Sequence, residues 1–184
     1  MKLKGLNEYD ICNYRAPSMF LIFPNCSFKC DKECGRPICQ NSALTHEPEI
    51  EVRAIDLIHK YLNNPLTHAI VCGGLEPLDS WDDLWSFICV FRCFSKDPVV
   101  IYTGYIEEEI KDKINFLARF GNIIVKFGRF IPDSPHIFDT VLGVELASNN
   151  QYAKKLQIKN GEMLDDDSTT NYGKDKVEEF NYGN

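Results

Sequence analysis

Four of the eight cysteines in this chain lie in one short stretch, from Cys26 to Cys39. Thiolates are soft ligands that suit zinc and iron–sulfur clusters. The first residues of the chain lack the apolar run of a signal peptide, so we expect a cytosolic protein whose thiols are reduced. In that compartment such a dense group of cysteines indicates a bound metal rather than disulfides.

The spacing of these cysteines bears on which metal they hold. The gaps between Cys26, Cys30, Cys34 and Cys39 contain three, three and four residues, and none is the Cys-x2-Cys knuckle of a structural zinc site. A [4Fe–4S] cube takes four ligands, so three protein thiolates leave one iron open for a substrate or cofactor. The spacing favours such a cluster, with a zinc site built from all four cysteines as the alternative. We expect the remaining cysteines to be packing residues, namely Cys12, Cys72, Cys89 and Cys93.

The composition limits what the chain can be. At 44% hydrophobic residues it can bury the core of one domain. Its net charge of −7 and the lack of a basic stripe argue against a nucleic-acid partner, and no stretch is apolar for long enough to cross a membrane. From Glu162 the sequence is acidic and poor in apolar residues. We therefore expect one domain over residues 1–161 and a disordered acidic tail over 162–184.

Apolar runs and amphipathic stretches alternate along the domain. We expect strands over 18–23, 68–72, 98–102 and 122–126, and helices over 51–63, 80–94 and 106–118. Ser80 with Asp83 has the spacing of a capping box. Residues 128–150 resemble a loop, and 155–159 a last strand. This alternation predicts an α/β fold with a parallel sheet, in which chemistry gathers at the C-terminal ends of the strands.

Three stretches with unusual residues follow predicted strands. The cysteine loop follows the first strand, Gly73-Gly74-Leu75-Glu76 follows the second, and Thr103-Gly104 follows the third. Because the C-terminal ends of parallel strands meet at one edge of a sheet, we expect the three stretches to face one mouth. The sequence therefore predicts a single site at that edge.

These residues resemble the radical S-adenosylmethionine (SAM) superfamily, most closely the small activating enzymes of the anaerobic (class III) ribonucleotide reductase. That family has a strand followed by Cys-x3-Cys-x2-Cys-His-Asn. Cys26 and Cys30 match the first two cysteines, and Cys39-Gln40-Asn41 matches the end of the motif with Gln in place of His. The stretch from Gly73 to Leu78 is similar to the Gly-Gly-Glu-Pro motif that receives the amino group of SAM.

Later stretches add to the resemblance. Ile101-Tyr102-Thr103-Gly104-Tyr105 is similar to a Tyr-Thr-Gly-Tyr stretch of the family, and the acidic residues 107–109 follow as they do there. Phe127-Gly128-Arg129-Phe130 and Ala147-Ser148-Asn149-Asn150-Gln151 are similar to Asp-Gly-Arg-Phe and Gly-Ser-x-Asn-Gln. Together the matches run in family order over residues 8 to 160.

The chain departs from the family pattern at two places. Six extra residues lie between Cys30 and Cys39, which makes the motif Cys-x3-Cys-x8-Cys. Cys34 lies inside the insertion and is an alternative third ligand. We favour Cys39, because Ile38 then occupies the apolar position before the last cysteine and Asn41 follows it as in the family. The second departure is Leu75, which separates the two glycines from the glutamate.

The resemblance implies a partial (β/α) barrel of radical SAM type. It implies that Cys26, Cys30 and Cys39 hold a [4Fe–4S] cluster, with no catalytic residue beyond these ligands. The SAM-binding residues that we expect from it are Ile38, Asn41, Gly73, Gly74, Glu76, Thr103 and Asn149.

The implied reaction begins when one electron, from a flavodoxin or ferredoxin, cleaves SAM to a 5′-deoxyadenosyl radical. The radical then abstracts a hydrogen atom from a glycine of anaerobic ribonucleoside-triphosphate reductase. The cofactor carries this chemistry, and the protein supplies placement. Two alternatives stay open: a radical SAM enzyme that acts on another protein or a peptide, and a non-catalytic binding domain stapled by zinc.

Overall fold

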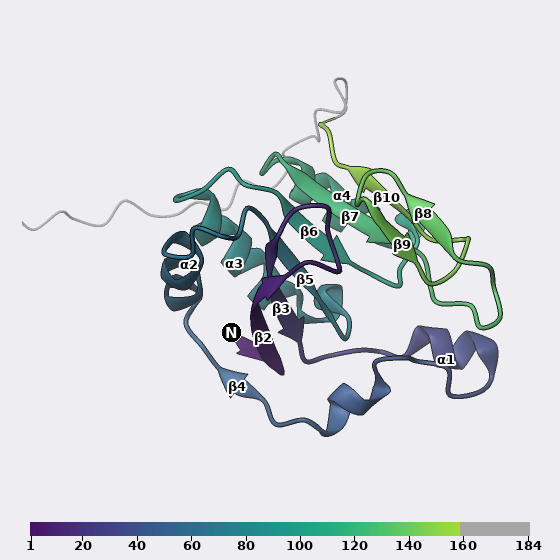
Figure 1. Cartoon of the computed structure of the whole chain (residues 1–184). Coiled ribbons are helices and arrows are strands. Elements are labelled where there is room, and N and C mark those ends of the chain that lie inside the picture. Colours follow the sequence, from purple (N-terminus) through teal and green to yellow (C-terminus); the bar gives the residue numbers. More distant parts are fainter. Residues whose placement is uncertain (159–184) are drawn as a thin grey trace, which may run out of the picture.

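The centre of the protein is a six-stranded, mostly parallel sheet (Figure 1). The structure is a computed structural model, and it describes residues 1–158. The strand order is β10-β7-β6-β5-β3-β2. The strands are β2 (Gly5–Asp10), β3 (Ser18–Phe23), β5 (Ile70–Gly74), β6 (Val99–Tyr102), β7 (Ile123–Phe127) and β10 (Tyr152–Lys155). The four inner strands run parallel, while β2 and β10 pair antiparallel at the two edges.

Helices connect the parallel strands. The segment between β3 and β5 contains α2 (Ala54–Leu62), the next crossover contains η2 (Pro77–Ser80) and α3 (Trp81–Arg92), and the last contains η3 (Glu107–Ile110) and α4 (Lys111–Ala118). The predicted α/β class and its parallel strands are therefore confirmed. The first crossover also holds the two short helices α1 (Lys29–Cys34) and η1 (Ser42–His46).

The two faces of the sheet are covered differently. Because side chains alternate along a strand, Met19, Ile70 and Val99 point to one face, where they pack with the buried residues of α2, α3 and α4. The other face, here called the inner face, carries Ala69, Val71, Val100 and Ile124. No α-helix residue among 1–158 belongs to the core cluster on that inner face.

Two non-helical segments close the inner face. One is the β2–β3 connection, which contributes the buried Tyr14, and the other is the segment of β8 (Ile137–Asp139) and β9 (Val144–Leu146), which contributes Leu142 and Leu146. The Arg15 guanidinium donates a hydrogen bond to the Thr140 carbonyl, so the two segments touch. The inner face is therefore lined by loops, and this leaves room for a pocket there.

Two predicted helices differ from the structure in where they begin or divide, and the helix expected over 80–94 spans Trp81–Arg92. The helix expected over 51–63 begins at Ala54, because β4 (Ile50–Glu51) pairs with β1 (Lys2–Leu3). The helix expected over 106–118 is divided into η3 and α4 at Ile110, whose backbone leaves the helical region. Its first turn is capped by Glu109, whose carboxylate accepts from the Ile106 N–H at 3.1 Å.

Three smaller predictions also need correction. Ser80 makes no side-chain cap for α3; its hydroxyl accepts from the Asn25 amide instead, at 3.0 Å. The segment 128–150 is not only loop, since it contains β8 and β9. The last strand of residues 1–158 spans 152–155, whereas a strand was expected over 155–159, of which residue 159 lies outside the described residues. The acidic tail expected over 162–184 lies outside the described residues. Among residues 1–158, no helix combines the length and apolarity that crossing a bilayer needs.

Candidate functional site at the C-terminal edge of the sheet

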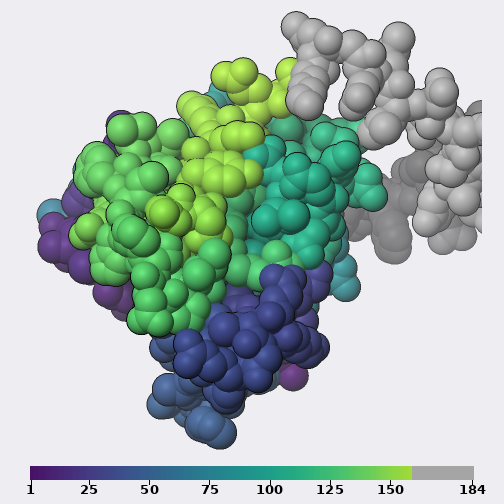
Figure 2. Space-filling view, turned by 90° about the vertical axis from the view of Figure 1, so that its right-hand side faces the viewer, coloured from purple at the N-terminus to yellow at the C-terminus, as the bar shows by residue number. Residues whose placement is uncertain are grey.

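A pocket of about 540 Å³ lies at the C-terminal edge of the sheet and extends over its inner face. It is bordered by the cysteine loop, by the segments that follow β5 and β6, by the end of β7 and by β9. The three stretches that were expected to share one mouth therefore do so. In Figure 2 the segment around α1, in dark blue, lies beside the segment between β7 and β10, in green.

Three of the four clustered cysteines line this pocket. They are Cys26, Cys30 and Cys39, each partly buried, whereas Cys34 is exposed on α1 and does not line it. Burial raises the pKa of Cys26 to about 11 and also raises the pKa of Cys30 and Cys39. A bound cation would reverse this by favouring the thiolates.

Backbone amides donate to all three sulfurs. The Phe28 N–H donates to the Cys26 sulfur at 3.2 Å. The Phe130 amide lowers the pKa of Cys30 in the same way, and the Asn41 amide does so for Cys39. Hydrogen bonds to the ionised form stabilise it, and such bonds to ligand sulfurs also tune a cluster. Each of the three thiols therefore has a backbone N–H donor that would stabilise its thiolate form.

Among residues 1–158, no three His, Cys, Asp or Glu side chains stand close enough together to hold one metal ion. A zinc ion needs its ligands in a single coordination shell. In a cube each thiolate binds its own iron, so the sulfurs stand farther apart. Three thiols that line one cavity are donors of the type that an iron–sulfur cluster takes.

The extra residues between Cys30 and Cys39 form a closed turn. The Asp31 carboxylate accepts from the backbone N–H groups of Ile38 and Cys39, both at 2.9 Å. The helix α1 ends at Gly35 in the left-handed conformation, with φ of 68°, which reverses the chain. The insertion therefore returns Cys39 to the side of Cys30, which sequence spacing alone did not reveal.

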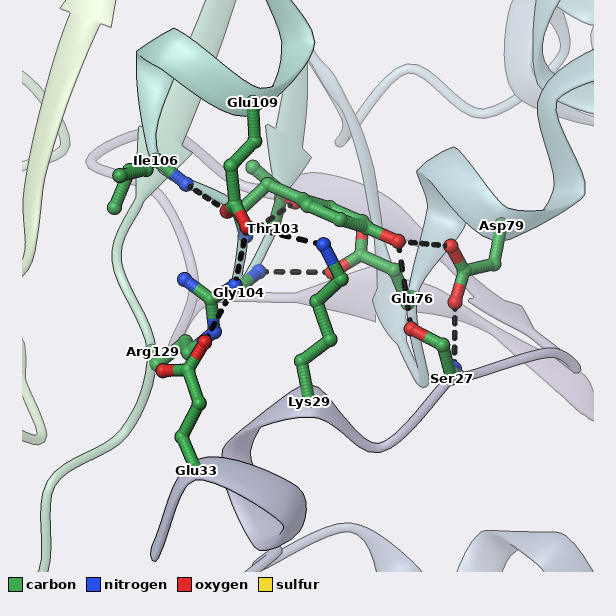
Figure 3. A network of polar contacts seen from close by, with 11 residues as sticks. Ser27, Lys29, Glu33, Glu76, Asp79, Thr103, Gly104, Ile106, Glu109 and Arg129 are labelled. Atoms are coloured by element: carbon green, nitrogen blue, oxygen red, sulfur yellow. Dashed lines mark hydrogen bonds and ion pairs between the residues drawn. The ribbon is translucent and has the colours of Figure 1, made fainter.

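Polar contacts fix the start of the cysteine loop to the rest of the rim. One Asp79 carboxylate oxygen accepts from the Ser27 N–H at 2.6 Å, and the other accepts from the Tyr105 hydroxyl at 2.6 Å (Figure 3). Asp79 belongs to η2 and Tyr105 follows β6. The residue after Cys26 is thus held by two other loops of the site.

A second group of charges fixes α1, which contains no buried residue. The Glu109 carboxylate accepts from Lys29 at 3.0 Å and from Arg129 at 2.6 Å, and Arg129 also pairs with Glu33 at 3.1 Å (Figure 3). The Arg129 hydrogen bond comes first among the causes that lower the pKa of Glu109 to about 2. Charges, rather than apolar packing, hold α1 on the rim.

Gly73 and Gly74 were expected to follow a strand over 68–72, but they are the last two residues of β5, and contacts with β3 require glycine at both positions. A Cβ on Gly73 would lie 2.7 Å from a ring carbon of Phe20. Gly74 has a φ of 87°, and a Cβ there would lie 2.5 Å from Cγ2 of Ile22. Both glycines line the pocket, and the Asn41 amide donates to the Gly74 carbonyl at 2.7 Å. The glycines therefore allow β5 to approach β3, and the Gly74 carbonyl also connects the end of β5 to the cysteine loop.

Glu76 is a buried carboxylate at the pocket wall. One oxygen accepts from the Leu78 N–H at 3.1 Å, and the other accepts from the Gly104 N–H at 2.8 Å. The Thr103 side chain also donates to it. Burial nevertheless raises the pKa of Glu76 to about 7, since the charged form loses its hydration. Carboxylate oxygens keep lone pairs for a further donor.

The structure brings together five of the seven residues expected to contact SAM. The lining residues of this set are Asn41, Gly73, Gly74, Glu76 and Thr103. Ile38 and Asn149 are not among the lining residues. Ile38 uses its backbone in the turn that Asp31 closes, and Asn149 is exposed and pairs with Ser134 at 2.9 Å.

Sequence reasoning missed other residues of the pocket, among them Cys12, Asn13, Tyr102, Lys126 and Gln151. Cys12 was expected to pack in the core, but it is exposed at the pocket, and Cys93 is exposed too. Lys126 carried a readable signal, because it is a charged residue at the end of an otherwise apolar strand. Tyr102 and Gln151 lie in stretches that resemble the family, whereas Cys12 and Asn13 carried no signal that distinguishes them from surface or core positions.

No protein-family model, curated protein or solved structure matches this chain.

Proposed function

We propose that this protein is a radical SAM enzyme that activates a glycyl-radical enzyme. It would hold a [4Fe–4S] cluster with Cys26, Cys30 and Cys39 and use SAM to abstract a hydrogen atom from a glycine of anaerobic ribonucleoside-triphosphate reductase. The observation that carries the proposal is that these three thiols share one pocket with the two glycines at the end of β5 and the buried carboxylate of Glu76. Cys34, the competing ligand, stands outside the pocket.

The sheet supports the finer proposal of a partial barrel of radical SAM type. Helices α2, α3 and α4 pack on one face, and the inner face is left to non-helical segments and the pocket. The volume, about 540 Å³, is in the range of pockets that hold small-molecule cofactors. The site also lies at the carboxyl ends of parallel strands, where α/β folds place their ligands.

Cys26, Cys30 and Cys39 would hold the cluster, which when bound would supply the one-electron reduction that cleaves SAM, with a flavodoxin or ferredoxin as the source of the electron. The residues of the chain would bind SAM and orient it. Glu76 would accept a hydrogen bond from the ammonium of SAM, since it lines the pocket and a carboxylate can accept more than the two backbone hydrogen bonds that it receives. Asn41 keeps the two glycines at the end of β5 beside the cysteine loop.

The apolar lining would keep water from the reacting atoms. Phe20 and Ile22 from β3 and Phe130 after β7 line the pocket with the thiols. Excluding water strengthens electrostatic contacts and protects reactive species. A glycine residue is a suitable target because its Cα carries no side chain that would block approach.

The test is to load the protein with iron and sulfide without oxygen, reduce it with SAM present, and assay 5′-deoxyadenosine. Adding the candidate reductase should then produce a glycyl radical in electron spin resonance. Formation of 5′-deoxyadenosine without a glycyl radical would favour another protein or a peptide as substrate. One zinc per chain, with no iron or sulfide and no cleavage of SAM, would refute the enzyme and favour the zinc-stapled domain.

A further inference from the structure

The segment that separates Cys30 from Cys39 lies at the surface. Residues 32–36, which form the end of α1 and the turn after it, are all exposed. In Figure 1 this helix stands apart from α2 and α3. Cys30 belongs to the same helix and lines the pocket. The helix that brings a proposed cluster ligand to the pocket therefore also presents exposed residues to solvent.

The charged side chains of this segment are used unequally. Its carboxylates have partners, because Asp31 accepts the two backbone hydrogen bonds that close the turn and Glu33 pairs with Arg129 at 3.1 Å. Its cations Lys32 and Arg36 form no ion pair within residues 1–158. The charges that the segment leaves for a partner are therefore positive.

These two cations match an acidic protein surface better than a small ligand. Neither Lys32 nor Arg36 lines the pocket, so neither is placed to contact a molecule bound there. The chain as a whole carries a net charge of −7 and would repel an acidic protein from most directions. Unpaired cations on one exposed face would steer such a partner to that face, because complementary charges raise the rate of a productive encounter.

We propose that residues 32–36 form a docking face for an acidic electron-carrier protein. This inference rests on the proposed function, because the electron acceptor is the cluster held by Cys26, Cys30 and Cys39. The reduced carrier loses one electron and the cluster gains it, and no atom is transferred. Docking on α1 would place the carrier close to Cys30, a ligand on that same helix. Electron-transfer encounters are weak and use small interfaces, so a short charged segment is sufficient.

The test follows reduction of the reconstituted cluster by the loss of its visible absorbance in a stopped-flow instrument. One reductant is a reduced acidic flavodoxin, and the other is photoreduced deazariboflavin, a small uncharged molecule that needs no docking face. With flavodoxin, the second-order rate constant should fall as salt rises, since salt screens exposed charges. Lys32→Glu/Arg36→Glu should lower this rate constant about ten- to a hundred-fold at low salt and leave reduction by deazariboflavin unchanged.

The matched control reverses two exposed lysines at the other edge of the sheet. Lys96 lies just before β6, and Lys155 pairs with Ile124 near the start of β7. Neither lysine forms an ion pair within residues 1–158. Lys96→Glu/Lys155→Glu changes the net charge equally and should leave the flavodoxin rate nearly unchanged. Equal slowing by the two pairs would assign the effect to overall charge and overturn the docking face.

Other outcomes would also overturn the docking face. The inference is wrong if the flavodoxin rate of the unaltered protein does not depend on salt, a result that needs no variant to fold. It is wrong if Lys32→Glu/Arg36→Glu keeps the full rate, or if it slows both reductants equally, because the effect would then lie at the cluster.

The outcomes for the two proposals differ. If flavodoxin reduces the cluster through residues 32–36 but SAM is never cleaved, the docking face stands and the radical enzyme falls. If SAM is cleaved with deazariboflavin as reductant while Lys32→Glu/Arg36→Glu keeps the full flavodoxin rate, the enzyme stands and the docking face falls.

Discussion

The Glu76 carboxylate accepts a hydrogen bond from the Gly104 N–H at 2.8 Å, which joins the loop after β5 to the loop after β6. The same side chain caps η2 through the Leu78 N–H. Glu76, which the sequence predicted to contact a cofactor, therefore also connects two of the three loops at the pocket. Its protonation should be visible in the stability of the protein.

We predict that the free energy of unfolding falls as pH rises from about 4.5 to 7. Burial raises the pKa of Glu76 from 4.5 to about 7, so in this range the folded protein keeps a proton that the unfolded chain has lost. Stability then decreases with pH, by up to about 3 kcal/mol, and levels off above 7. Urea unfolding at pH 5, 6, 7 and 8 measures this dependence.

Glu76→Gln should flatten this slope, because the amide does not ionise. The matched control is Glu51→Gln, which changes an exposed glutamate on β4 and should leave the slope as it is. A Glu76→Gln protein with the same pH slope as the unaltered protein would show that another group is responsible.

A second prediction concerns the charges that hold α1. The pKa of Glu109 is lowered to about 2, chiefly by the Arg129 hydrogen bond. The stabilisation is present above pH 4.5 and is lost as pH falls toward 2, because the unfolded chain then binds the proton first. Glu109→Gln should remove the stabilisation at all pH values and increase hydrogen exchange of the α1 amides at neutral pH.

The effect on α1 has a close control in the neighbouring glutamate. Glu108 lies on η3 beside Glu109 and makes no salt bridge in the described structure. Glu108→Gln should leave exchange in residues 29–34 unchanged. Equal protection of α1 in both variants would mean that the cysteine loop is held by other contacts, such as those of Asp79.

A third prediction concerns Gly74, the last residue of β5. Gly74→Ala combines a φ of 87° with a Cβ that would lie 2.5 Å from Cγ2 of Ile22, 3.1 Å from its Cα and 3.2 Å from the Phe23 nitrogen. Two of these atoms belong to the backbone of β3, so they cannot move aside cheaply. We expect a loss of about 2–4 kcal/mol in the free energy of unfolding, measured by chemical denaturation.

Gly35→Ala is the control that separates strain from collision. Gly35 has a φ of 68°, also left-handed, but a Cβ there meets nothing within 4 Å. The cost should then be only about 1 kcal/mol, that of the backbone conformation. If both variants lose equal stability, the contact with β3 is not what requires glycine at position 74.

Particular residues show which parts of the fold and of the site could be predicted from the sequence and which could not. Continuous apolar runs predicted the parallel strands, and β3 has the predicted bounds because Pro24 follows it directly. The site edge was predictable because residues after parallel strands must meet. Ser80 failed as a cap because Asn25 takes its hydroxyl, a contact between residues far apart in the chain. Lys126 was missed because its orientation depends on which face of the sheet the helices cover.

The last prediction tests the choice of ligands. Cys26→Ala, Cys30→Ala and Cys39→Ala should each lose the visible absorbance and the acid-labile sulfide of a reconstituted cluster, since a cube with one open iron has no spare thiolate. Cys34→Ala should keep both, because Cys34 is exposed and lies outside the pocket. None of the four cysteines is fully buried, so we expect each of the four variants to fold. A Cys34→Ala protein that loses the cluster while Cys39→Ala keeps it would move the third ligand to α1. The Asp31 turn would then no longer serve to place a ligand.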